Sequence, residues 1–336
     1  MKRFSSLIKS IIQDTTPFRP SLVNPANLVK MTSSMQPANT ATTNESLSAS
    51  SHPSAQSSAP PVSAYERAGV AQPPNTAALK SASKPLPVVE ALQIKVNDSR
   101  GGSVPAFLHM SPQHDSTHPP TTAAILLSGA GGGVTGPAGI YVSMGTKLAA
   151  LDATIPTLRM DYRFPARNGP SCKDVLAGMD YLESAFGIQR FVLVGWSFGG
   201  APVFTVGGKD KRVVGCATVA SQTAETEGIR QLAPRPVLLL HGTGDSTLSP
   251  YCSEKLYSLY GERGQRDIKF FEGDNHALSR NSAVAEKLLI DFIVKCAGAR
   301  MSDGEKRLVE EELVKGKDKM EMMKKGGDLR GNEQIE

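Results

Sequence analysis

The sequence predicts an α/β fold with a mostly parallel sheet of about eight strands and helices on both faces. Residues 86–299 alternate short apolar runs with longer amphipathic stretches, as strands connected by helices do. The first two runs adjoin without a helix, which makes that edge of the sheet antiparallel. Hydrophobic residues make up 40% of the chain, enough for a core. No run reaches the roughly 20 apolar residues that span a bilayer.

In chain order, eight segments have the apolar and β-branched composition of strands: 88–96, 104–110, 123–128, 154–161, 191–195, 213–220, 236–241 and 268–271. Five have helical spacing: 140–151, 171–186, 199–206, 250–260 and 282–296. In an open parallel sheet, sites form at the carboxyl ends of the strands. Functional residues are therefore expected in the loops that follow these runs.

The first residues of the chain, MKRFSSLIKSIIQ, predict an amphipathic helix. Its apolar residues recur on one helical face: Phe4, Leu7, Ile8, Ile11 and Ile12. The segment is basic and contains serine, and its first acidic residue is Asp14, a composition typical of a mitochondrial presequence. The alternative is a plain surface helix, and the expected location is then the cytoplasm.

The chain divides into three parts. Residues 1–85 hold the amphipathic helix and then, from about residue 20, a Ser-, Ala- and Pro-rich stretch that predicts a disordered linker. Residues 86–299 form the α/β domain. Residues 300–336 are rich in Lys, Glu and Met, and we expect a charged tail that begins as an exposed helix around 308–314 and then frays. Neither end is expected to contain catalytic residues.

Composition excludes several classes of function. The net charge is +5, and eight Lys and Arg against three Asp and Glu fall in the first 85 residues, which leaves no basic stripe for nucleic acid. The cysteines are widely spaced and predict free thiols. His114 and His118 lie in a Pro-rich loop without a third ligand, so no metal site is predicted. No cofactor is expected.

The stretch FVLVGWSFGGA at 191–201 predicts a nucleophile elbow, the G-x-S-x-G turn between a strand and a helix. The serine, Ser197, must hold a strained conformation to raise its hydroxyl above the sheet, and side chains two residues away would collide. Gly195 and Gly199 remove those side chains. The alternative is an ordinary Gly-Ser turn after a buried strand.

Two further side chains complete a catalytic triad in the order serine, acid, histidine. Asp245 follows the run that ends at His241, and His276 follows the run that ends at Phe271. A serine hydroxyl needs a base, and the base needs an orienting acid. We therefore assign Ser197 as nucleophile, His276 as base and Asp245 as the orienting acid.

Three other residues near these loops receive structural roles. His241 precedes the acid and abuts its strand, so it is expected to pack the loop that carries the acid. Asp274 and Glu272 lie too close to His276 along the chain to reach around its ring. They are expected to shape its loop or stay solvated.

Acyl transfer also needs N–H donors for the oxyanion. One is the N–H of Phe198, after the nucleophile. The other is expected from the glycine-rich loop 129–133 after the strand at 123–128, with Ala130 as first choice and Gly131 as second. This loop lacks the lysine of a P-loop and the spacing of a dinucleotide fingerprint, so phosphate binding is not favoured.

On the motifs LLSGAGGG, MDYR, GWSFGGA, HGTGD and GDNHAL, residues 122–297 resemble the α/β-hydrolase superfamily, particularly its small, lid-poor members related to dienelactone hydrolases. The resemblance implies the same triad and the same two oxyanion donors. The chain departs from the pattern of this superfamily at two positions. Dienelactone hydrolases use a cysteine nucleophile, so their substrate is not carried over, and many relatives have a histidine where this chain has Ser128.

The expected activity is cleavage of a small carboxylic ester or thioester through an acyl-serine intermediate. The connection between 220 and 236 is too short for a helical lid, which predicts an open site. Trp196 and Gly131 are the expected substrate contacts, although packing beneath the elbow is the alternative for Trp196. Arg163 is expected to brace the oxyanion loop or to meet an anionic substrate.

Three other functions stay open at this point: a catalytically silent interaction module, an acyltransferase with the same triad, and a peptidase. GWSFGG also resembles the catalytic domain of prolyl-oligopeptidase-like peptidases. Those enzymes restrict access with a β-propeller, and here a predicted linker stands in its place.

Overall fold

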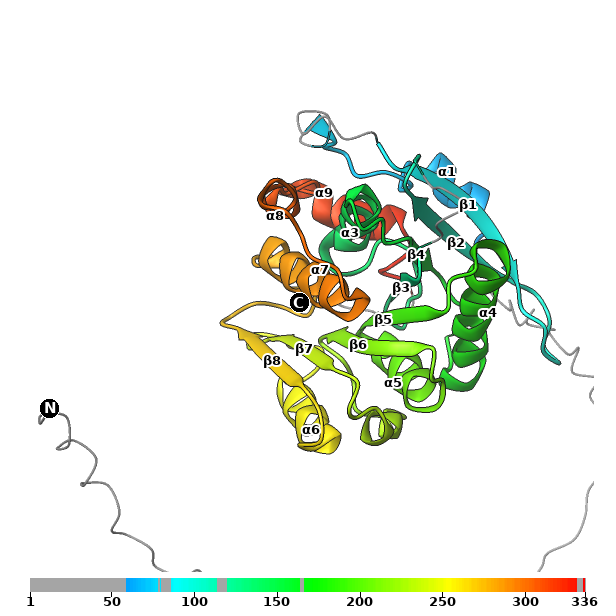
Figure 1. Cartoon of the computed structure of the whole chain (residues 1–336). Coiled ribbons are helices and arrows are strands. Elements are labelled where there is room, and N and C mark those ends of the chain that lie inside the picture. The colour runs from blue at the N-terminus through cyan, green and yellow to red at the C-terminus, as the bar shows by residue number, and fades with distance from the viewer. Residues whose placement is uncertain are drawn as a thin grey trace, which may run out of the picture. The chain divides into compact units, whose positions relative to one another are not determined.

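The computed structural model describes residues 59–77, 79, 86–113, 120–163, 166–330 and 335, and one compact unit, Ser54–Glu336, contains all of them. Its centre is an eight-stranded sheet in the order β1-β2-β4-β3-β5-β6-β7-β8 (Figure 1). The strands are β1 (Val88–Lys95), β2 (Ser103–Met110), β3 (Thr122–Leu127), β4 (Thr157–Met160), β5 (Arg190–Trp196), β6 (Val213–Val219), β7 (Val237–Gly242) and β8 (Arg266–Phe271). The predicted α/β class and all eight predicted strands are confirmed.

Strand pairing confirms the antiparallel edge. β2 pairs antiparallel with both β1 and β4, and the pairs from β4 through β3, β5, β6 and β7 to β8 are parallel. The register sets Leu127, the last residue of β3, opposite Gly195 near the end of β5. The loops that follow these two central strands therefore begin side by side.

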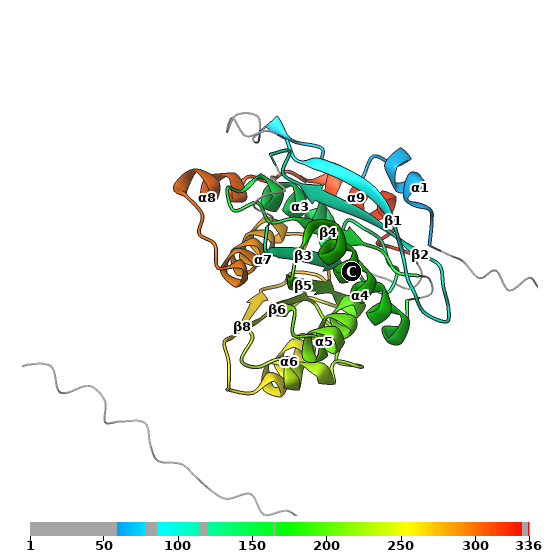
Figure 2. The ribbon, with the colours of Figure 1, turned by 45° about the vertical axis from the view of Figure 1, so that its right-hand side comes forward.

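Helices cover both faces of the sheet (Figures 1 and 2). One face carries α4 (Asn168–Phe186), α5 (Gly200–Lys209) and α6 (Tyr251–Tyr260), and the other carries α3 (Ile140–Ala150) and α7 (Ser282–Ala297). Short 3-10 turns precede α3 and α5: η1 (Pro137–Gly139) and η2 (Ser197–Gly199). The five predicted helices correspond to α3, α4, α5, α6 and α7.

The core has two main layers, one on each face of the sheet. Strand β5 contributes to both because successive side chains of a strand point to opposite faces. Phe191 and Leu193 join the cluster under α4 and α5, while Val192, Val194 and Trp196 join the cluster under α3 and α7. All five are fully buried. The run FVLVGW is therefore apolar throughout because both faces of this central strand are covered.

The compact unit extends further toward the N-terminus than the predicted boundary at residue 86. Within the stretch predicted as linker, helix α1 (Val62–Arg67) packs on the side of the sheet that carries α3. Its Tyr65 is buried, and so are Val70 and Leu79. Burial of these few apolar residues offsets the cost of ordering a segment that is polar elsewhere. The predicted amphipathic helix lies outside the described residues.

The C-terminal segment differs more strongly from the prediction. It contains α8 (Asp303–Glu310) and α9 (Lys317–Lys325), and α8 begins with a capping box between Ser302 and Glu305. Apolar side chains that come in neighbouring pairs are buried in the core: Leu308, Val309, Leu313, Val314, Met322 and Met323. The segment is part of the domain. None of the helices within the described ranges is both long and apolar enough to cross a membrane.

Candidate active site

The turn after β5 has the strained geometry that the glycine pattern predicts. Ser197 has a φ of 54°, in the left-handed region that non-glycine residues rarely adopt. A Cβ at Gly195 would stand 2.5 Å from the carbonyl carbon of Gly199. A Cβ at Gly199 would stand 2.7 Å from the carbonyl oxygen of Ser128. Both glycines are therefore required by close backbone approach, and Ser197 is held in an uncommon conformation at the carboxyl end of a central strand.

The structure brings the predicted acid and base together. Asp245 Oδ2 lies 2.6 Å from His276 Nδ1, although the two residues are 31 positions apart, and both side chains are 0% exposed. They come from the loops after the neighbouring strands β7 and β8. Burial alone would raise the pKa of Asp245, but hydrogen bonds with His241 and His276 outweigh it and hold the pKa well below its ordinary value. The carboxylate is therefore ionised and orients the imidazole.

His241 anchors the same carboxylate from the strand side. Its Nε2 lies 3.0 Å from Asp245 Oδ2, and its Nδ1 lies 2.7 Å from the Ser253 hydroxyl, so both ring nitrogens are engaged inside the protein. The N–H groups of Thr247 and Leu248 donate to Asp245 Oδ1, each at 2.8 Å. This matches the packing role expected for His241, since its ring holds Asp245 and the loop that carries it.

The loop that carries His276 is shaped by Asp274, as expected. Its carboxylate accepts hydrogen bonds from the N–H groups of Asn275, Arg280 and Asn281, at 2.9, 3.2 and 2.9 Å. Glu272 is exposed. Neither residue competes with Asp245 for the imidazole of His276 in these contacts.

Trp196 packs against His276 from within the core. Its indole N–H donates to the carbonyl oxygen of His276 at 2.9 Å, and the centroids of the two rings are 5.5 Å apart. The side chain is fully buried. The residue beside Ser197 is therefore tied directly to the residue assigned as base. A contact between Trp196 and substrate stays a prediction.

The glycine-rich loop follows β3 and runs next to the elbow, as the register requires. Ala130 is exposed, whereas Gly131 is buried. A Cβ at Gly131 would stand 2.8 Å from the backbone nitrogen of Arg330, so the main chain of the C-terminal segment lies against this glycine. The oxyanion roles of Ala130 and Phe198 stay predictions. The substrate contact of Gly131 likewise stays a prediction.

Comparison with known proteins gives the fold. No family model matches the chain. Over 131 residues the chain is 33% identical to the uncharacterized protein YfhR of Escherichia coli; the match covers 32% of this chain and 46% of that protein, so the chain spans about half the length of this curated relative. Est1E from Butyrivibrio proteoclasticus superposes with a TM-score of 0.50 at 16% identity, covering 62% of this chain and 99% of that one.

A dienelactone hydrolase from Anabaena variabilis superposes with a TM-score of 0.51 at 15% identity, covering 62% of this chain and 98% of that one. The chain has the α/β-hydrolase fold. At these identities the likeness shows the fold alone.

Within this α/β-hydrolase fold, the connection from β6 to β7 holds only the short turn η3 (Glu227–Gln231), as its length predicts. The openness of the site stays a prediction. Ser197 is 6% exposed and His276 is fully buried. The main chain of the C-terminal segment lies against the glycine-rich loop, a contact that the sequence did not predict.

Arg163 has neither of the roles expected for it. Its guanidinium pairs with Asp98 at 2.7 Å and with the buried Asp174 at 2.5 Å, which ties the β1–β2 turn to α4. Asp161, two residues earlier in the same MDYR motif, braces the loop instead. Its Oδ1 accepts a hydrogen bond from the Gly133 N–H at 2.9 Å.

Sequence reasoning missed the residues that surround this brace. Tyr65 of α1 donates to Asp161 Oδ2 at 2.5 Å, and Arg330 of the C-terminal segment contacts the same oxygen at 2.6 Å. Arg159 on β4 donates to the carbonyl oxygen of Val134 at 2.7 Å. No local pattern marks these residues because their partners lie far away in the sequence. Only the position of Asp161 just beyond a strand end could have pointed to a role at the loop.

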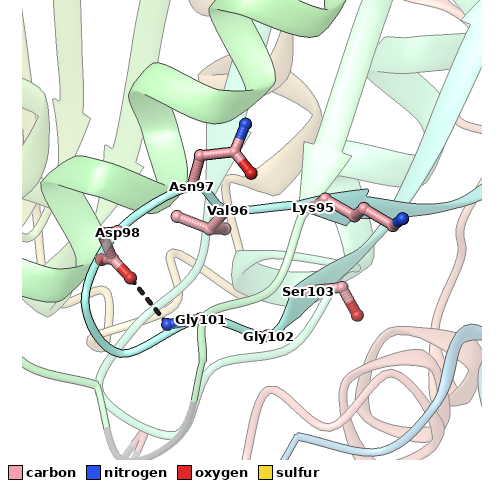
Figure 3. Close-up of a pocket in the computed structure, with 7 residues that line it drawn as sticks. All are labelled: Lys95, Val96, Asn97, Asp98, Gly101, Gly102 and Ser103. Carbon is pink, nitrogen blue, oxygen red and sulfur yellow. Dashed lines mark hydrogen bonds between the residues drawn. The ribbon is translucent and has the colours of Figure 1, made fainter.

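The described residues contain no cluster of three or more His, Cys, Asp or Glu that could hold a metal ion. His114 and His118 lie outside the described residues. A surface cavity is present at the distant β1–β2 edge, where Asp98 accepts a hydrogen bond from the Gly101 N–H at 3.0 Å (Figure 3). That cavity is lined by Lys95, Val96, Asn97, Asp98, Gly101, Gly102 and Ser103. It is a feature of the turn and lies several strands away from Ser197.

Proposed function

We propose that the protein is a serine hydrolase that cleaves small carboxylic esters or thioesters. The observation that carries the proposal is the buried Asp245–His276 pair, at 2.6 Å, in loops at the same edge of the sheet as Ser197, whose backbone is in the left-handed region. Trp196 links the two parts because it precedes Ser197 and donates to the His276 carbonyl oxygen. Activation of a serine hydroxyl requires a base that a third group orients, and Asp245 orients the imidazole of His276 in this way.

In the proposed reaction, Ser197 Oγ attacks the carbonyl carbon of the substrate while His276 Nε2 takes the hydroxyl proton. Asp245 holds the Nδ1–H and stabilises the imidazolium that forms. The N–H groups of Ala130 and Phe198 donate to the oxyanion of the tetrahedral intermediate. The intermediate expels the alcohol or thiol, which receives the proton from His276, and leaves an acyl-serine. Water then attacks the acyl carbon, His276 again carries the proton, and the carboxylic acid departs.

The test is covalent labelling with a fluorophosphonate probe, followed by peptide mass spectrometry, alongside hydrolysis of p-nitrophenyl acetate. We expect one adduct, on Ser197. Labelling should vanish in Ser197→Ala and fall at least about 10³-fold in rate in His276→Ala, because triad members act as a unit. Circular dichroism controls for folding of each variant.

The alternative functions predict other outcomes. A folded wild-type protein that is neither labelled nor active would favour the silent interaction module. Labelling with faster acyl transfer to an added alcohol or amine than to water would favour an acyltransferase. Cleavage of p-nitroanilide peptides at rates similar to esters would favour a peptidase.

A further inference from the structure

The C-terminal segment 326–330 is joined to the glycine-rich loop by one buried carboxylate, Asp328. Asp328 is fully buried. Its Oδ1 accepts from the Ser128 hydroxyl at 2.5 Å and from the Gly136 N–H at 2.7 Å. Its Oδ2 accepts from the Thr135 hydroxyl at 2.6 Å and from the Thr135 N–H at 3.0 Å. Four donors converge on this side chain, almost 200 positions away in the sequence.

These four donors lie at the two ends of the loop. Ser128 is the residue between β3 and the glycines, and Thr135 and Gly136 stand just before η1. One carboxylate therefore clamps the start of the loop to its end. Ala130, whose N–H is the proposed oxyanion donor, lies between the clamped ends.

The backbone packing of the two segments is equally close. A Cβ at Gly133 would stand 2.6 Å from the backbone nitrogen of Asp328, and a Cβ at Gly131 would stand 2.8 Å from that of Arg330. Arg330 also contacts Asp161, which accepts the Gly133 N–H. The glycines thus let the main chain of the C-terminal segment lie directly on the loop, and the carboxylates fix its position.

The clamp requires an acid of this size at this position. Two of the four donors are backbone N–H groups, which cannot reverse and accept a hydrogen bond. An asparagine has the same shape but presents an NH₂ group on one side, which would meet a backbone N–H. Ser128 belongs to the same arrangement because its hydroxyl donates to Asp328.

We propose that Asp328 is a positioning residue of the oxyanion loop, so that residues 326–330 complete the active site rather than form a tail. The inference rests on the proposed function. Asp328 touches no reacting atom; it acts by holding the backbone around Ala130 where its N–H meets the oxyanion. Displacing such a donor costs transition-state stabilisation and leaves ground-state binding nearly intact.

The experiment compares wild type, Asp328→Asn and the control Asp303→Asn, the same chemical change at an exposed position of α8. Active sites are titrated with the fluorophosphonate, and kcat and KM are measured with p-nitrophenyl acetate. Inhibition by a trifluoromethyl ketone is measured in parallel, because this inhibitor binds as a tetrahedral oxyanion. For Asp328→Asn we expect kcat to fall about 10- to 100-fold with KM within about threefold, and the inhibition constant to rise by a similar factor. Asp303→Asn should match wild type.

A structural role alone would lower the number of titrated sites and leave kcat per site and the inhibition constant unchanged. That result, or equal behaviour of the two variants, overturns the inference. If Asp328→Asn does not fold, Ser128→Ala takes its place, since it removes one of the four donors. Ser128→Ala should lower kcat and raise the inhibition constant of the ketone together. Wild-type values of both quantities would overturn the inference. A wild type without labelling or turnover overturns the proposed function and this inference with it, whereas an active wild type with unaffected variants overturns the inference alone.

Discussion

Gly195→Ala tests the steric basis of the elbow. The new Cβ would stand 2.5 Å from the carbonyl carbon of Gly199, whereas real Cβ contacts stay above 3.0 Å, so the turn must open by at least about 0.5 Å. The atoms it meets are backbone and cannot rotate away. Overpacking of this kind costs about 1–3 kcal/mol of stability. A misplacement of 1 Å costs about 100-fold in rate, so a shift of half that size should lower kcat about tenfold.

The assay is hydrolysis of p-nitrophenyl acetate per fluorophosphonate-titrated site, with urea unfolding to measure stability. Gly304→Ala is the matched control, because the nearest atom to its Cβ is 4.0 Å away and it is an exposed residue in the first turn of α8. It should leave kcat unchanged and stability unchanged or raised by up to about 1 kcal/mol. Wild-type kcat and stability in Gly195→Ala would refute the steric argument, because the elbow would then tolerate a side chain.

Two further predictions concern buried charges. Asp245→Asn should reduce the acid sensitivity of the fold. The folded-state pKa of Asp245 is lowered from 3.8, so its stabilisation is complete above that unfolded value and is lost as the pH falls through the folded pKa. Urea midpoints at pH 3 and pH 7 measure this, and an equal drop in both proteins would contradict it. Lys147→Met should lower the free energy of unfolding by about 3–5 kcal/mol. It leaves the buried carboxylate of Glu286, now 2.8 Å from Lys147, without its counter-charge. Adding Glu286→Leu should restore most of the urea midpoint, and no recovery would show that the loss has another cause.

The sheet and the Asp245–His276 pair could be predicted because their signals are local. Each strand is a short apolar run, and a parallel topology brings the loops after the strands to one edge. Asp245 and His276 each lie just after such a run, so their meeting follows from topology without knowledge of any long-range contact. The glycines of the elbow are likewise explained by the backbone around one residue.

The role of the C-terminal segment could not be predicted in the same way. Its composition, KGKDKMEMMKKGGD, is that of a solvated helix, and the apolar Met322 and Met323 are the few signs that one side is buried. Asp328 follows two glycines and has no motif; its importance comes from donors 192 to 200 positions away. Arg163 is an opposite case. Its position near a strand end predicted a role at the glycine-rich loop, but its guanidinium pairs with Asp98 and Asp174.

Trp196 is the only tryptophan in the chain; it precedes Ser197 and donates its indole N–H to the carbonyl oxygen of His276. All indole fluorescence of the protein therefore arises from one position, 5.5 Å from the ring of His276. A protonated imidazole quenches a neighbouring indole far more strongly than a neutral one does. The emission intensity, followed against pH, thus reports the protonation of the proposed base without a label. A change in that intensity during acylation would allow the reaction to be followed by intrinsic fluorescence.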